Sequence, residues 1–127
     1  MNILNCTYPN PFINKLYPDG LFGDIYIGNV IFSSNNDIYI DIHTQMKPAI
    51  ETKKMGIFGL NYNIIVIRLS AVKHKNIIIS NWGRQDFLPL KITEEDDGFF
   101  LEQKKDEFVF QIKAKSFLFG NLSVYLK

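Results

Sequence analysis

The sequence predicts a mainly β fold: a single domain, 1–127, built as an antiparallel β-sandwich or partly closed barrel of about eight strands with a short N-terminal helix. Three observations lead to this prediction. The chain holds 11 Phe and 6 Tyr, and such residues suit pleated, half-buried surfaces. Short alternating segments follow one another closely, and no long stretch has a helical period. A chain of this length buries roughly two-thirds of the surface that it exposes when unfolded, enough for one core without a disulfide or a metal.

The short helix is predicted between two turn-forming stretches near the N-terminus. Asn10 is a suitable N-cap, and Pro11 suits the first helical position because the N–H that it lacks would have no partner there. The apolar residues that follow are spaced as on one face of a helix: Phe12, Ile13, Leu16 and Tyr17. The sequence Pro18-Asp19-Gly20 then ends the helix.

The next two segments, 24–33 and 37–45, predict a β-hairpin. Its turn at 34–36 contains two asparagines, which tolerate the positive φ of tight hairpins. Gly28-Asn29 breaks the alternation of the first strand, so a bulge is expected there. The second strand has one isoleucine face and one polar face, typical of a half-exposed strand, and the polar face carries Asp37, Tyr39, Asp41 and His43.

Two long apolar segments, 62–72 and 76–82, form the centre of the predicted fold. The short charged turn Lys73-His74-Lys75 joins them. Because both faces of the pair are largely apolar, we expect a hairpin in the middle of a sheet, covered on both sides. The preceding stretch, 46–60, has proline and two glycines and neither period, so it is expected to be a long connection over one end of the core.

The C-terminal part predicts a meander of short strands. Pro89 cannot donate to a ladder, so the segment 87–93 is expected at a sheet edge or a bulge. An acidic turn at 94–98 follows it. The remaining strands, separated by polar turns, are 99–103, 108–114 with Phe108, Phe110, Ile112 and Ala114 on one face, and 122–126, which can extend back to 117–119.

Charge and composition exclude several classes of function. The formal net charge is +1 and the basic residues are scattered, so nucleic acid is not expected as a partner. The single cysteine, Cys6, cannot form an internal disulfide, which fits a reducing compartment. The start of the chain does not resemble a signal peptide, and no run of about eighteen apolar residues predicts a membrane span. We therefore expect a cytoplasmic protein without a membrane partner.

The residues that carry chemistry do not form a recognisable set. His43 and His74 are the only histidines, and no spacing of potential ligands is typical of a metal site. Neither a Gly-x-Ser-x-Gly elbow nor a glycine-rich phosphate loop is present. Asp37 and Asp41, four apart on a strand, would lie about 13 Å from each other, too far for an acid and base pair. We expect no catalytic residue, no metal and no cofactor.

An acidic run is the strongest local charge feature. It consists of Glu94, Glu95, Asp96 and Asp97, and residues 94–107 contain seven of the 13 acidic residues. One interpretation is a solvated hairpin turn whose charges discourage edge association. The other is a docking surface for a basic protein, because clustered carboxylates steer association. Trp82 is expected in the core, or as a binding anchor if its ring reaches the surface beside Arg84.

From Pro48 onward the order of features resembles the immunity protein 50 family, small bacterial proteins that neutralise a cognate polymorphic or contact-delivered toxin. The similar parts are a proline-led segment, the two long apolar segments and a terminal pair of strands: 48–54, 59–69, 76–82, 108–110 and 123–126. Asn10-Pro11-Phe12 to Tyr17 also resembles the helical start of that family. Ile50-Glu51 departs from the family pattern, which usually has an aromatic residue near the proline segment.

The resemblance implies stoichiometric inhibition in the cytoplasm, as in contact-dependent growth inhibition. A rigid surface would occlude the active site or an exosite of the C-terminal domain of the toxin. Toxins of such systems are often nucleases and hence basic. The partner-binding residues expected on this basis are Glu94, Glu95, Asp96 and Asp97, and a second candidate patch is Asp37, Tyr39 and Asp41. A small-ligand-binding β-barrel is the alternative function, suggested by the aromatic and apolar content.

Overall fold

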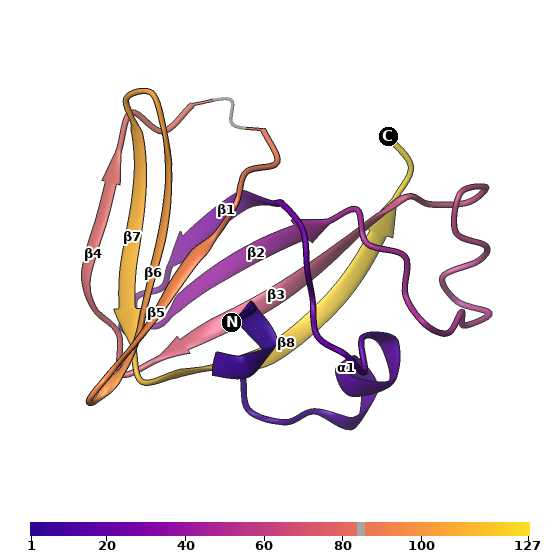
Figure 1. Ribbon diagram of the computed structural model, residues 1–127, viewed down its shortest axis with the longest axis horizontal. Helices are drawn as coiled ribbons and strands as arrows, with labels where there is room; N and C mark the ends of the chain where they lie inside the picture. The colour runs from indigo at the N-terminus through magenta and orange to yellow at the C-terminus, as the bar shows by residue number, and fades with distance from the viewer. Residues whose placement is uncertain (84–85) are drawn as a thin grey trace.

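The computed structural model describes residues 1–83 and 86–127 and confirms a mainly β fold with two antiparallel sheets of four strands each (Figure 1). The arrangement is sandwich-like and does not close into a barrel, because each sheet keeps two edge strands. The elements in chain order are η1 (Ile3–Cys6), α1 (Pro11–Leu16), β1 (Ile25–Phe32), β2 (Ile38–Thr44), β3 (Ile64–Val72), β4 (Lys75–Ser80), β5 (Lys91–Glu95), β6 (Gly98–Lys105), β7 (Phe108–Ala114) and β8 (Ser116–Tyr125).

The predicted N-terminal helix is confirmed as α1. The Asn10 side-chain oxygen accepts hydrogen bonds from the backbone N–H groups of Phe12, at 3.0 Å, and Ile13, at 3.2 Å, as an N-cap does. Ile13 and Leu16 are buried in the core, which the helix shares with both sheets. Phe12 is more exposed and lies near Phe119 of β8, with 6.2 Å between ring centroids. The helix therefore packs beside the edge of the first sheet.

The first sheet has the strand order β1-β2-β3-β8. The predicted hairpin is confirmed, and Asn36 in its turn has a φ of 66°. The predicted bulge is also present, as a register shift between Ile27 and Asn29. The isoleucines of β2 face the core, as expected from their alternation. Sheet pairing therefore places Asn29, Asp41 and Arg68 next to one another across three strands.

The prediction of a central hairpin at 62–72 and 76–82 is wrong. β3 lies between β2 and β8 in the first sheet, whereas β4 is an edge strand of the second sheet and pairs only with β7. Lys73 and Asn76 have φ values of 50° and 55°, which turn the chain from one layer into the other. β4 is mostly exposed, and Ile78 keeps 49% of its surface accessible. Alternating apolar residues do not say which sheet a strand joins.

The second sheet has the strand order β4-β7-β6-β5 and crosses the first at a large angle in Figure 1. The predicted apolar face of β7 is confirmed as core, with Phe108, Phe110, Ile112 and Ala114 buried. Buried Gln103 of β6 connects the layers: its Nε2 donates to the carbonyl oxygens of Ile25, at 3.0 Å, and Leu88, at 3.1 Å. Pro89 precedes β5, which is an edge strand as predicted.

The last strand, β8, is continuous from Ser116 to Tyr125, so the segments 117–119 and 122–126 extend into one element. A register shift beside Gly120 interrupts its pairing with β3. A side chain at Gly120 would approach the Arg68 carbonyl oxygen to 3.2 Å, a tight contact, so the small residue suits the bulge. No helix within 1–83 and 86–127 is long and apolar enough to span a bilayer.

Candidate partner-binding surfaces

The acidic run lies at the tip of the β5–β6 hairpin, which projects from one end of the molecule (Figure 1). Glu94 and Glu95 end β5, and Asp96 and Asp97 form the turn, all four with exposed side chains. Gly98 closes the turn with a φ of 153°, which L residues rarely adopt, and a Cβ there would overlap the Ala114 carbonyl oxygen. The backbone of the tip is therefore held against the start of the β7–β8 connection.

Two lysines from other strands bind two of these carboxylates. The Nζ atom of Lys113 in β7 lies 2.9 Å from Asp97 Oδ1 and 3.2 Å from Glu95 Oε1. Lys75 in β4 lies 3.0 Å from Asp97 Oδ2. Hydrogen bonds from Lys113 and then Lys75 lower the pKa of Asp97 to about 2. Asp97 is therefore a fixed anion at neutral pH, and the turn is tied to its own sheet.

The tip is consequently a surface of mixed charge. Lys73 and Lys115 line the same groove, of about 630 Å³, as the four acids. Within 1–83 and 86–127, Glu94 and Asp96 make no ion pair. These two carboxylates are therefore the ones available to a partner. Sequence spacing gave no signal for Lys75 and Lys113, because strand pairing brings them to the turn from 15 or more residues away.

The three other acidic residues within 94–107 lie away from the acidic turn. Asp106 and Glu107 lie at the opposite end of the β6 strand, in the β6–β7 turn, and Glu102 lies within the strand. An eight-residue strand spans about 25 Å, so the two turns are well separated. Glu102 is paired with Lys104 at 3.4 Å. The clustering of acidic residues in the sequence therefore overstates how many of them lie together at either end of β6.

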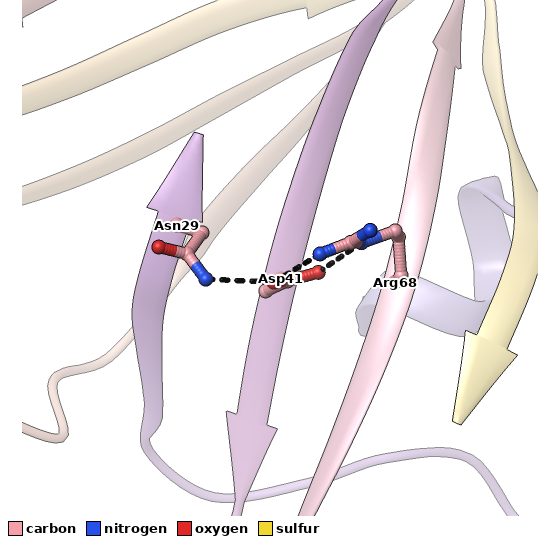
Figure 2. A network of polar contacts seen from close by, with 3 residues as sticks. All are labelled: Asn29, Asp41 and Arg68. Atoms are coloured by element: carbon pink, nitrogen blue, oxygen red, sulfur yellow. Dashed lines mark hydrogen bonds and ion pairs between the residues drawn. The ribbon is translucent and has the colours of Figure 1, made fainter. Parts of the chain in front are cut away.

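The second candidate patch is only partly accessible, because Asp41 is buried with 5% of its surface exposed. Figure 2 shows its carboxylate between Asn29 and Arg68. Arg68 donates from Nε to Oδ1 at 2.8 Å and from Nη2 to Oδ2 at 3.0 Å, and Asn29 donates from Nδ2 to Oδ2 at 3.0 Å. Asp41 is therefore an internal ion-pair residue on the outer face of the first sheet, and its expected role in partner binding stays a prediction.

Electrostatics support this structural role. The hydrogen bond from Arg68 is the main cause that lowers the pKa of Asp41, with a further contribution from Asn29, while burial opposes both. The carboxylate therefore stays ionised despite its burial. His43, the next polar residue on this face of β2, does not hydrogen-bond to Asp41.

His43 belongs instead to an aromatic cluster farther along the same face. Its Nδ1 lies 2.9 Å from the hydroxyl oxygen of Tyr125, and its ring is 5.0 Å from that of Tyr26 between centroids. A Cβ at Gly28 would overlap the imidazole, so the missing side chain in β1 makes room for the ring. Burial lowers the pKa of His43, so the ring is neutral at physiological pH.

In the second patch, Asp37 is exposed and Tyr39 is half-buried. Both lie toward the same end of the molecule as the acidic turn. The link is the 73–75 connection: His74 Nε2 lies 2.7 Å from the Asn36 carbonyl oxygen, and the next residue, Lys75, binds Asp97. The structure thus brings Asp37 and the acidic turn, distant in sequence, to one end of the sandwich. We call this end, formed by residues 33–37, 73–75 and 94–98, the charged end.

Trp82 was expected in the core or as an anchor beside Arg84. Trp82 is 43% exposed, and its ring meets that of Phe108 edge-on, with 6.1 Å between centroids. Arg84 lies outside the described residues. Cys6 is buried, and burial raises the pKa of its thiol to about 12, so the thiol is protonated at neutral pH. Among the residues that the structure describes, no group of His, Cys, Asp and Glu is arranged to hold a metal ion.

Comparison with protein-family models, with curated proteins and with solved structures gives no match to this chain. The charged end and the outer sheet face are therefore the features from which a function can be inferred.

Proposed function

We propose that this protein is an immunity protein that binds the C-terminal domain of a cognate toxin in the cytoplasm and neutralises it by stoichiometric occlusion, as in contact-dependent growth inhibition. The proposal combines the resemblance to the immunity protein 50 family with one structural observation. That observation is the charged end, where a projecting turn exposes the side chains of Glu94 and Asp96. The ion pairs of Asp97 hold this turn in place.

A preorganised charged turn suits fast recognition of a basic partner. Exposed carboxylates at a projecting tip attract a positively charged domain from a distance and raise the association rate. Because Lys113 and Lys75 hold Asp97, ordering the turn on binding costs little additional entropy. The expected contacts are Glu94 and Asp96, with Glu95 and Asp97 positioning the turn.

The surface proposed for the partner extends beyond the acidic turn. A standard interface buries about 800 Å² on each partner, more than one turn can supply. Asp37 and Tyr39, linked to the turn through the 73–75 connection, extend the surface across both sheets. The partner expected on this basis is a basic, nuclease-like toxin domain, with its own positive charges facing Glu94, Asp96 and Asp37.

Charge reversal at the turn tests the proposal. We expect Glu94→Lys combined with Asp96→Lys to slow association with the cognate toxin domain by about tenfold or more at low salt, with the difference shrinking as salt screens the charges. Stopped-flow fluorescence measures the rate. The control is Asp106→Lys with Glu107→Lys, the same charge change in the turn at the opposite end. Equal rates for the two double variants at low salt would rule out the charged end as the binding site.

The alternative functions have less support. A barrel carrier needs strands closed around a cavity, whereas these strands form two open sheets with side chains packed between them. For an enzyme, His43 is the residue to test, since it is a half-buried neutral imidazole. Robust hydrolase turnover that is lost in His43→Ala would contradict a purely inhibitory role.

A further inference from the structure

The edge strand β8 is longer than the other outer strands and, like β1 at the opposite edge of the same sheet, carries no charged residue. It is the longest strand, with ten residues, Ser116–Tyr125, none of which is charged. It pairs with β3 on one side only. Natural proteins commonly guard such edges with lysine, proline or a short strand, because the unpaired backbone groups can pair with another chain. A bulge at Gly120 is the only such device that β8 contains.

Hydrogen bonds show which backbone groups of β8 face outward. The N–H of Asn63, just before β3, donates to the Tyr125 carbonyl oxygen at 3.0 Å, so Tyr125 faces β3. Since N–H and C=O of one residue point to the same side and alternate along a strand, those of Val124 and Leu122 point away from β3. No residue within 1–83 and 86–127 bonds to them.

The N-terminal part of this edge already accepts an additional segment of the same chain. Thr7 and Phe117 form an isolated parallel bridge, and the N–H of Tyr8 donates to the Phe117 carbonyl oxygen at 2.9 Å. The edge is therefore able to pair with extended backbone. The part that stays open lies beyond the bulge, from Asn121 to Tyr125.

An apolar groove runs beside the open part. It has a volume of about 500 Å³, and its apolar lining consists of Phe12, Met55, Phe119, Leu122 and Val124. Large apolar side chains on or next to the strand are exposed as well: Leu118, Tyr125 and Leu126. Outward backbone groups combined with an apolar groove are the features by which a sheet edge binds a further strand.

We propose that the open half of β8 pairs with the same strand of a second copy of this chain, in antiparallel orientation about a two-fold axis. Pairing centred on Ser123 sets Leu122 of one copy opposite Val124 of the other, so the outward backbone groups bond to each other. The two apolar grooves then become continuous, and the two sheets join into one of eight strands. An uncharged strand pairs with itself without like-charge repulsion, and two-fold dimers are the commonest assemblies. This inference is independent of the proposed function.

A single lysine tests the dimer. In the proposed pair the two Ser123 side chains lie directly opposite each other on the exposed outer face, so Ser123→Lys places two like charges there. We expect it to raise the dissociation constant of the dimer at least tenfold, measured by sedimentation equilibrium over a range of concentrations. The matched control is Ser80→Lys, the same change at an exposed residue of β4, the edge of the other sheet, which is expected to leave the constant unchanged.

A second variant tests the backbone contact. Val124→Pro removes an outward N–H and keeps the ladder to β3, so it is expected to weaken the dimer while circular dichroism shows an unchanged fold. A monomer at all concentrations in the unmodified protein would overturn the proposal and leave the edge open for another partner. A dimer that neither variant weakens would overturn it too, because the contact would then lie elsewhere.

Discussion

Replacing Ile67 by alanine is expected to lower the free energy of unfolding by about 2–5 kcal/mol. Ile67 lies in the middle of β3 with 1% of its surface exposed and belongs to the core between the two sheets. The change removes buried methyl and methylene groups and leaves a cavity that the crossed layers cannot fill by a small shift. Urea denaturation of the two proteins measures the difference.

Ile78→Ala is the control for this prediction. The residue type and the change are the same, and from the sequence both isoleucines belong to long apolar strands. Ile78, however, lies on the edge strand β4 and is 49% exposed, so we expect a loss below about 1 kcal/mol. Equal losses for the two variants would contradict the separation of β3 and β4 into different sheets.

Replacing Arg68 by methionine is expected to lower the free energy of unfolding by about 1–3 kcal/mol at pH 7. The loss arises because Asp41 remains buried and ionised with only Asn29 as a partner. Methionine keeps much of the aliphatic length of arginine, so the effect of packing is small. Lys75→Met is the control, since it removes a lysine from an exposed ion pair and is expected to cost below about 1 kcal/mol.

The dependence of this loss on pH identifies its cause. The pKa of Asp41 in the folded protein is lowered, so its stabilisation is complete above the unfolded-state pKa of about 3.9 and disappears as the pH falls through the folded-state value. In Arg68→Met, the guanidinium that lowers the pKa of Asp41 is absent. The difference in stability between the two proteins should therefore be largest near pH 7 and shrink toward pH 3. A difference independent of pH would mean that the ion pair does not stabilise the fold.

Local sequence chemistry was sufficient for the turns and the helix. Asn10 and Pro11 predict the start of α1 because capping and a fixed φ act within one turn of the chain. The asparagines at 35–36 and the break at Gly28-Asn29 similarly predict the hairpin and its bulge. These features depend on the conformations open to individual residues, so they can be predicted without knowing the rest of the fold.

The candidate sites were less predictable because their decisive partners come from distant strands. Asp41 belongs to an alternating polar face, which indicates exposure, yet Asn29 and Arg68 lie beside it only after β1, β2 and β3 pair in register. The acidic turn was predicted as a charge cluster, but its lysine partners arrive on β4 and β7. A charged residue in the sequence can therefore be buried or paired with an opposite charge in the folded protein.

For this protein, the sequence by itself determined the mainly β class, the short capped helix, the first hairpin and the inward face of β7, since each depends on local periodicity or turn chemistry. Only the tertiary structure decided that β3 and β4 belong to different sheets, that Asp41 is an internal ion-pair residue and that β8 offers an open uncharged edge. The physical reason is that strand pairing is non-local. Apolar alternation specifies which face of a strand is buried, whereas the neighbour of each strand depends on how all the strands fill one core.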